Sequence, residues 1–246
     1  MKKSLIMMMA VLLLPALLCA KGAIVGYAAG WAAAPSDAQL DMVTHVMVFQ
    51  VHPLANGDLN RGSLANWLTK AWVTKAHSKN VKVSVAIGGW VGSGENKSPQ
   101  AAYWVSATNS QNIDRFVNNL VALVNEFGLD GLDIDWEYPQ GDSGWQQYMN
   151  LCRKLREKLP GKRLSSALPG STPNGYYSNV VKNGIMNALD AIHLMAYDME
   201  GSWGNHSALA PSKKLIDDWA QWTAGTEGYD KEKLFLGVPF YSKKNF

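Results

Sequence analysis

The feature that most constrains the fold of this 246-residue chain is a regular alternation between short apolar runs and longer amphipathic stretches. Runs rich in valine, isoleucine and leucine predict seven strands, over residues 23–27, 45–51, 81–89, 131–137, 163–169, 191–197 and 233–240. Strands that are separated by helices are typical of parallel βα units. Because these strands are almost continuously apolar, they also predict a sheet that is covered on both faces.

Between most of these strands, apolar residues recur at positions i, i+3 and i+4, which predicts helices. The clearest helical pattern covers residues 110–128, with Ser110 as the expected N-cap and Gly128 as the expected C-cap. Further patterns predict helices within residues 63–80, 145–159 and 212–224.

Two architectures fit this order of elements: an open doubly wound sheet and a (β/α)8 barrel. The open sheet should carry a GxGxxG loop after its first strand, but Gly26 and Gly30 lack that spacing. Polar and aromatic residues instead follow the ends of several strands, where barrel active sites lie. We therefore expect an α/β chain folded as a (β/α)8 TIM barrel. The chain ends at Phe246, six residues after the seventh strand, so we expect the barrel to be truncated there.

The first twenty residues are typical of a secretory signal peptide, with Lys2 and Lys3 preceding an apolar stretch that reaches Leu18. We therefore expect a secreted protein, extracellular or periplasmic, with one C-terminally incomplete barrel domain over residues 21–246. A lipid anchor through Cys19 is the less favoured alternative, since Leu18 is not the small residue that usually precedes a lipidated cysteine. No later run is long and apolar enough to predict a transmembrane segment.

Composition excludes some classes of partner. Loss of the first twenty residues removes two lysines and no acid, which lowers the formal charge from +3 to +1. A nearly neutral chain does not favour nucleic acid as a partner, because nucleic-acid binding normally needs a basic face. Cys152 would be the one remaining cysteine, so we expect no internal disulfide, and its helical spacing predicts a buried, inert thiol. We expect a monomer.

The segment GLDGLDIDWEYP, residues 128–139, places four carboxylates on an otherwise apolar strand. Alternate residues of a strand share one face, so Asp133, Asp135 and Glu137 should form a ladder that points into the barrel. The intervening apolar residues should face the helices. Crowded carboxylates cannot all ionise at their usual pKa, so we expect a shared proton and at least one raised pKa. A carboxylic acid whose pKa is raised, and which lies at the mouth of a pocket, is suited to general acid catalysis.

Two other roles for these carboxylates involve no catalysis, namely a structural acidic network and a calcium-binding loop. A buried acidic network that only stabilises the fold would use the same residues. A calcium loop would begin at Asp133, but its sixth position is Tyr138 rather than glycine and its twelfth is Gly144 rather than glutamate. We therefore expect no metal site, and nothing in the sequence indicates a cofactor.

The segment DGLDIDWE, residues 130–137, resembles the DxxDxDxE signature of the family 18 glycoside hydrolases, the chitinase family. The stretches GYAAGW, THVMVFQV, VAIGGW, LMAYD and KLFLGVPFY resemble further strand motifs of that family, in the same order. The resemblance covers nearly all of residues 23–241. It implies a TIM barrel that hydrolyses β-1,4 bonds next to N-acetylglucosamine by substrate assistance, with retention.

The resemblance also implies roles for the carboxylates. Glu137 would be the general acid and then the base, and Asp135 would stabilise the acetamido group as it attacks. Asp133 would lie beneath and share a proton with Asp135, and Asp130 would hold the network in place. The partner would be chitin or another glycan that contains N-acetylglucosamine.

Other matching positions imply substrate contacts. Tyr197 would contact the acetamido carbonyl. Further residues would bind the sugar or position the acids, namely Tyr27, Trp90, Met195, Asp198 and Tyr241. Ala86 replaces a serine that in the family hydrogen-bonds the lower aspartate, and we expect Ser84 to substitute partly.

Three functions remain open from the sequence. The first is a chitinase-type hydrolase. The second is a non-catalytic chitin-binding protein, or an inactive fragment, on the same scaffold, which the missing eighth strand would favour. The third is an endo-β-N-acetylglucosaminidase, whose chemistry is the same.

Overall fold

Seven parallel strands form the centre of the molecule, and their order follows the sequence. The computed structural model describes residues 22–90, 99–170, 178–199 and 206–241. The strands are β1 (Val25–Ala29), β2 (His45–Pro53), β4 (Lys82–Gly88), β5 (Gly131–Asp135), β6 (Arg163–Pro169), β7 (Ala191–Met195) and β8 (Leu234–Gly237). A two-residue strand, β3 (Leu59–Asn60), pairs antiparallel with β2. All seven predicted strands are confirmed, and their bounds differ by a few residues.

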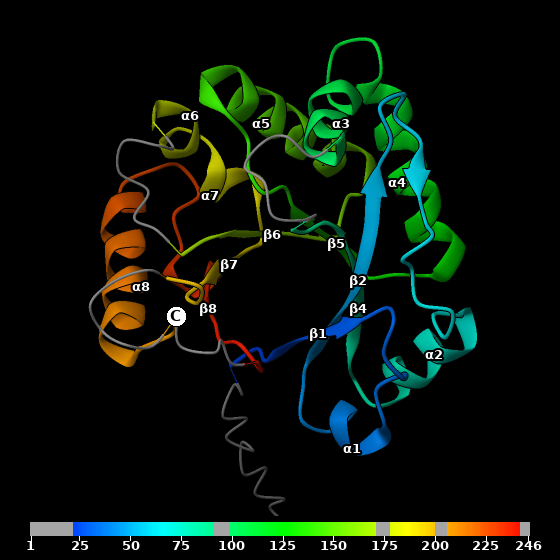
Figure 1. Cartoon of the computed structure of the whole chain (residues 1–246). Coiled ribbons are helices and arrows are strands. Elements are labelled where there is room, and N and C mark those ends of the chain that lie inside the picture. Colours follow the sequence, from blue (N-terminus) through cyan, green and yellow to red (C-terminus); the bar gives the residue numbers. More distant parts are fainter. Residues whose placement is uncertain (1–21, 91–98, 171–177, 200–205, 242–246) are drawn as a thin grey trace, which may run out of the picture.

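Helices lie around the outer face of the curled sheet (Figure 1). They are α1 (Asp37–Leu40), α2 (Lys70–Ser78), α3 (Pro99–Ala107), α4 (Ile113–Phe127), α5 (Gly141–Lys158), α6 (Ser178–Lys182), α7 (Ile185–Ala188) and α8 (Leu209–Thr223), with a 3-10 turn, η1 (Lys231–Lys233). The helices predicted within residues 110–128, 145–159 and 212–224 are confirmed. None of the helices in the described part of the chain has the length and apolar character that crossing a membrane requires.

Two predicted helix starts are wrong. The pattern over residues 63–80 becomes helical only at Lys70, because the Thr69 side chain accepts a hydrogen bond from the Trp72 N–H and so caps the helix there. The N-cap of α4 is Asn112 rather than Ser110. The C-cap prediction is confirmed, because Gly128 adopts the left-handed conformation (φ 71°) and its N–H donates to the Val124 carbonyl.

The sheet is an open half-barrel. Each strand pairs with the next from β1 to β8, and among the described residues no strand joins β8 back to β1. The side chains next to these two edges are exposed apolar groups, with Ile24 55% and Val238 59% exposed. The concave face of the sheet therefore opens toward β1 and β8, and the candidate site lies on that face.

The outer face of the sheet packs beneath the helices as the alternation predicted. Leu132 and Ile134 of β5 are fully buried in the main apolar cluster. Trp136 stacks on Trp104 of α3, with ring centroids 5.0 Å apart. Cys152 of α5 lies in the same cluster, where burial raises the pKa of its thiol to about 12. The prediction that the thiol is buried is confirmed, and its raised pKa disfavours the reactive thiolate.

Asp130 braces the start of β5 and does not join the carboxylate ladder. Its Oδ2 atom accepts hydrogen bonds from the Val83 N–H of β4, at 2.8 Å, and contacts the His77 ring of α2, at 2.6 Å. The expectation that Asp130 holds the ladder in place stays a prediction, and these contacts mean that it would act by bracing the strand. Asp130 precedes the strand at its amino end, so its side chain reaches sideways to the neighbouring strand rather than up into the barrel.

The same brace recurs before β7. Asp190 precedes that strand as Asp130 precedes β5, and its Oδ2 atom accepts a hydrogen bond from the Leu164 N–H of β6 at 2.8 Å. Arg156 of α5 pairs with this carboxylate at 2.7 Å. In both places one carboxylate ties together a strand, its neighbour and a helix, which sets the register at the amino end of the sheet.

Candidate active site

The carboxylate ladder points into the concave face, as strand alternation predicted. Asp133 is 0% and Asp135 5% exposed, whereas Glu137, just past the end of β5, is half-buried. Asp135 and Glu137 line the cleft described below, and Asp133 lies beneath it. The chain therefore carries three acids from the barrel interior to the cleft surface within five residues.

Asp133 is surrounded by three hydrogen-bonding side chains from other strands. The Tyr27 hydroxyl of β1 donates to its Oδ2 atom at 2.7 Å, and the Ser165 hydroxyl of β6 donates to Oδ1 at 2.5 Å. The His193 ring of β7 lies 3.3 Å from Oδ1. Burial alone would raise the pKa of Asp133, but His193, Ser165 and Tyr27 together lower it below its usual value. The lowered pKa of Asp133 therefore favours its ionised form in spite of its burial.

Ser84 does not take the place of the serine that Ala86 replaces, so that expectation is wrong. The Ser84 hydroxyl is buried and has no hydrogen-bond partner among the described residues. The reason is register, since Ala86 stands opposite Asp133 on one side while Ser84 stands opposite Gly131. Ser165 stands opposite Asp133 on the other side and supplies the missing hydroxyl. In the sequence, Ser165 could have been found as a polar residue on the inward face of the strand that follows the ladder.

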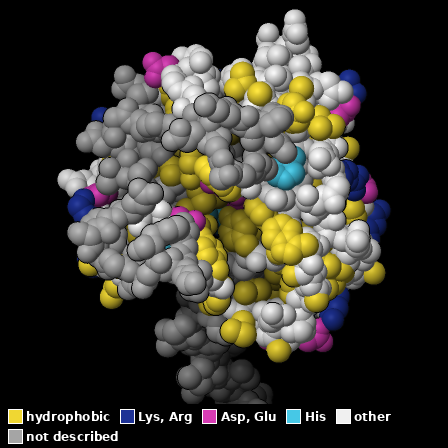
Figure 2. Space-filling model, in the orientation of Figure 1, with side chains coloured by type: hydrophobic (Ala, Val, Ile, Leu, Met, Phe, Trp, Pro, Cys, Tyr) yellow, Lys and Arg dark blue, Asp and Glu magenta, His cyan; other side chains and the backbone are white. Residues whose placement is uncertain are grey.

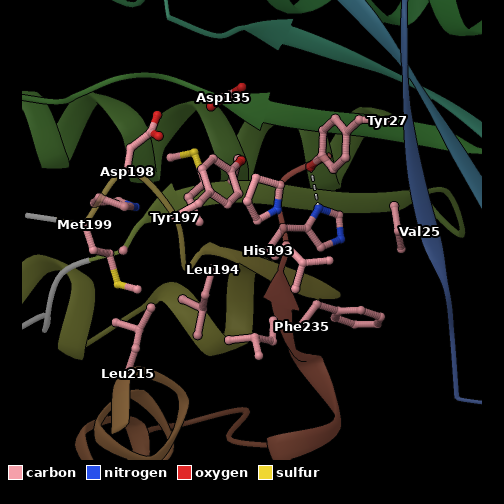
Figure 3. A pocket seen from close by; sticks show the side chains of 18 of the residues that line it. Val25, Tyr27, Asp135, His193, Leu194, Tyr197, Asp198, Met199, Leu215 and Phe235 are labelled. Carbon is pink, nitrogen blue, oxygen red and sulfur yellow. Dashed lines mark hydrogen bonds between the residues drawn. The ribbon is translucent and has the colours of Figure 1, made fainter. Parts of the chain in front are cut away.

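His193 is a second site residue that sequence reasoning missed. Its Nδ1 atom lies 2.7 Å from the Tyr27 hydroxyl, across the open side of the half-barrel (Figure 3). Because the Tyr27 hydroxyl donates to ionised Asp133, the hydroxyl oxygen must accept from His193, which places the proton on Nδ1. His193 precedes Met195 by two residues and so shares the inward face of β7, which was the signal in the sequence.

Asp135 and Glu137 form a coupled pair. Burial raises the pKa of Asp135 well above its usual value, and the charges of Glu137 and Asp133 add to the effect. Burial also raises the pKa of Glu137, although hydrogen bonds from Tyr138, Asp135 and the Trp90 N–H oppose it. Because Asp133 is saturated by other donors, the extra proton belongs to the Asp135–Glu137 pair. The expectation that Asp133 and Asp135 share a proton stays a prediction, and the directions of these pKa shifts favour a proton on the Asp135–Glu137 pair.

The glycines of VAIGGW allow the third strand motif to approach the ladder closely. Gly88 has φ +99°, and a Cβ atom there would lie 2.2 Å from the Asp135 carbonyl oxygen. The Gly89 N–H donates to that same carbonyl at 2.7 Å. The two glycines therefore position the backbone of Asp135 directly, which a side chain at residue 88 would prevent.

The ladder opens into a cleft of about 1870 Å³. Hydrophobic side chains gather around the central hollow, and acidic side chains lie within it (Figure 2). The predicted substrate residues all line this cleft: Tyr27, Trp90, Met195, Tyr197, Asp198 and Tyr241. Trp90 is 55% exposed, and Trp31, also at the cleft, is 73% exposed. Exposed indole rings present flat apolar faces that stack on sugar rings.

Tyr197 and Asp198 follow β7 at its carboxyl end, on the same side of the cleft as Met195. Figure 3 shows the Tyr197 ring between Asp198 and His193, with Asp135 beyond it. Burial raises the pKa of the Tyr197 hydroxyl, and the nearby Asp135 charge adds to this, so the hydroxyl stays protonated and able to donate. Trp203, which its indole ring makes a further candidate for a sugar contact, lies outside the described residues. So do Ser242 and Lys243, which stand where the family that the sequence resembles commonly has glycine and arginine.

We expect Ser165→Ala to destabilise the protein by about 2 kcal/mol at neutral pH, because it removes a hydroxyl that donates to a buried carboxylate. Ser84→Ala is the matched control and should change stability by less than about 0.5 kcal/mol, because that hydroxyl has no partner to lose. Urea unfolding of both variants measures the difference. Equal losses would contradict the assignment of Ser165 to Asp133.

Comparisons with known proteins agree on one family. The model of the glycosyl hydrolases family 18 matches residues 23–245. An endochitinase 1 from Metarhizium robertsii is 31% identical over 70% of this chain, and a probable chitinase 2 from Drosophila melanogaster is 32% identical over 69%. The matched regions are 43% and 36% of those relatives, so the chain spans less than half of their length.

The folds agree as well. The crystal structure of a chitinase from Rhizomucor miehei superposes with a TM-score of 0.69 at 27% sequence identity, over 88% of this chain and 68% of that one. A chitinase from Bacteroides thetaiotaomicron superposes with a TM-score of 0.70 at 22% identity. At that identity the second likeness concerns the fold alone.

Proposed function

This chain belongs to family 18 of the glycosyl hydrolases, and from that membership we propose that it cleaves β-1,4 bonds next to N-acetylglucosamine in chitin or chitooligosaccharides. The observation that carries the proposal is the Asp135–Glu137 pair at the cleft surface, above Asp133, whose pKa is lowered. An inert sugar-binding scaffold has no need of a protonated carboxyl with a raised pKa at the surface of its cleft.

Glu137 supplies the proton in this proposal. Its raised pKa keeps the carboxyl protonated closer to neutral pH, so it donates to the glycosidic oxygen as the bond to the anomeric carbon breaks. The resulting carboxylate then takes a proton from the incoming water. Since the donor must be protonated, activity should fall as the pH rises through the raised pKa of Glu137.

The nucleophile in this proposal is the acetamido oxygen of the substrate itself, so no second enzyme carboxylate has to attack. The oxygen closes onto the anomeric carbon as the leaving oxygen departs with the proton of Glu137, and water later opens the ring that forms. Asp135 accepts from the acetamido N–H and stabilises the positive charge, and Tyr197 donates to the acetamido oxygen. An intramolecular nucleophile gains effective molarity because it is already in place.

We further propose that the protein is secreted as a monomer after removal of residues 1–20, which lie outside the described residues. Figure 2 supports a polymeric glycan as substrate, because the cleft is open and bordered by hydrophobic side chains. Polysaccharides bind to such surfaces through the apolar faces of their rings.

The test compares product release from chitooligosaccharides, a high-mannose glycopeptide and a bacterial cell wall, with NMR detection of the first anomer formed. Release from chitooligosaccharides with retained β configuration is expected. Release from the glycopeptide instead would indicate an endo-β-N-acetylglucosaminidase with the same chemistry. Calorimetric binding of chitooligosaccharides without any product would contradict the hydrolase and support a chitin-binding protein.

A further inference from the structure

Two side chains, from the segments that follow β7 and β8, contact the carboxylate of Asp198. The Tyr241 hydroxyl, after β8, donates to the Oδ2 atom of Asp198 at 2.9 Å. The Nδ1 atom of His206, which precedes α8, lies 3.0 Å from the Oδ1 atom. The His206 and Tyr241 rings lie side by side, with centroids 5.3 Å apart. Both carboxylate oxygens of Asp198 are thus contacted by groups from the two segments that follow β7 and β8.

The contact between His206 and the Asp198 carboxylate is a hydrogen bond when Nδ1 of His206 carries the proton. An imidazole nitrogen either accepts or donates a hydrogen bond, and two acceptors at 3.0 Å repel each other. In the other tautomer Nδ1 accepts a hydrogen bond from the backbone N–H of Asp198, at 3.2 Å. With the proton on Nδ1, His206 donates to the Asp198 carboxylate at 3.0 Å, a contact that the negative charge strengthens, and this tautomer links the segment before α8 to the wall of the cleft.

The orientation of Asp198 matters because its charge acts on Glu137. The Asp198 backbone has φ +55°, an uncommon conformation for a residue other than glycine. Asp198 is one of the charges that raise the pKa of Glu137. The other groups that face Glu137 are Asp135, Tyr138, Tyr197, Tyr241 and the Trp90 N–H. Lys214 also lines the cleft, but it pairs with Asp218 on its own helix.

We propose that His206 is a positioning residue, which together with Tyr241 holds the Asp198 carboxylate in the orientation that faces Glu137. This role rests on the proposed function only in that Glu137 is taken as the acid. His206 does not line the cleft and acts through Asp198. Its loss lets the carboxylate turn toward solvent, since Asp198 lies at the surface with 43% of its side chain exposed.

The experiment titrates the Glu137 carboxyl by carbon-13 NMR in protein labelled at glutamate side chains, with Glu137→Gln to identify its resonance. His206→Ala should lower the pKa of Glu137 toward the value in Asp198→Asn, because the negative charge moves away. His206→Asn retains an N–H close to the position of Nδ1 and should leave the pKa of Glu137 as in the wild type. The readout needs no turnover, so it stands even if the wild type releases no product.

Where the wild type is active, kcat/KM should fall about tenfold in His206→Ala and less than threefold in His206→Asn. In Asp198→Asn, the addition of His206→Ala should lower kcat/KM no further than Asp198→Asn does alone. An unchanged or raised pKa of Glu137 in His206→Ala would overturn the proposal, since Asp198 would then be held without His206. Equal loss of thermal stability in both His206 variants, with additive effects on top of Asp198→Asn, would also overturn it and leave a purely structural role.

Discussion

Glu137→Gln is expected to lower kcat on a chitooligosaccharide by about a thousandfold, which is within the range that a positioned general acid contributes. Glutamine has nearly the same size but carries no proton to donate to the leaving oxygen. Substrate affinity, measured by calorimetry, should change less than about threefold because the walls of the cleft are unaltered. The melting temperature should be equal or higher, since the variant removes one of two crowded, buried carboxyls.

Asp218→Asn provides the matched control for that experiment. Asp218 also lines the cleft, but it pairs with Lys214 on α8, and within the described part of the chain no hydrogen bond or ion pair joins it to the ladder. We expect its kcat to stay within about twofold of the wild type, because an exposed ion pair contributes little. A Glu137→Gln protein with unchanged turnover would refute the assignment of Glu137 as the acid, whatever the control shows.

The second large effect concerns stability and is expected for Gly88→Ala. The new Cβ atom would lie 2.2 Å from the Asp135 carbonyl oxygen and 2.7 Å from the Trp104 ring, in a backbone conformation that alanine rarely adopts. Steric overlap and backbone strain together should cost about 4 kcal/mol, which corresponds to roughly a 10 °C fall in melting temperature. Activity should fall as well, because the backbone that carries Asp135 has to move.

Gly128→Ala separates the two causes of that loss. Gly128 also has a positive φ, +71°, but a Cβ atom there meets nothing within 4 Å. Its substitution should therefore show the backbone cost alone, about 1 kcal/mol, with turnover unchanged. Comparable losses in the two variants, measured by urea unfolding, would mean that the close approach of Gly88 to Asp135 is not what the strand motif provides.

Much of the site follows from local periodicity. The seven strands follow from short, nearly continuous apolar runs. The ladder of Asp133, Asp135 and Glu137, and the burial of Leu132 and Ile134 on the other face, follow from the alternation of side chains along one strand. That alternation is a property of consecutive residues, so it can be recognised in the sequence.

Pairing between strands could not be recognised in this way. Ser84 and Ser165 both lie on inward faces, and only the register decides that Ser165 meets Asp133 while Ser84 has no partner. The same holds for Asp130, whose carboxylate turns to β4 instead of the ladder. Register depends on the tilt and stagger of neighbouring strands, which no single strand encodes.

The sequence by itself determined which residues become strands, which face of β5 carries the acids, and to which family the motifs belong. Only the tertiary structure decided which acid stays charged and which pair holds the proton. Asp133 is ionised because Tyr27, Ser165 and His193 converge on it from three other strands. Desolvation and hydrogen bonding set a pKa, and both depend on groups brought together by folding rather than by adjacency in the chain.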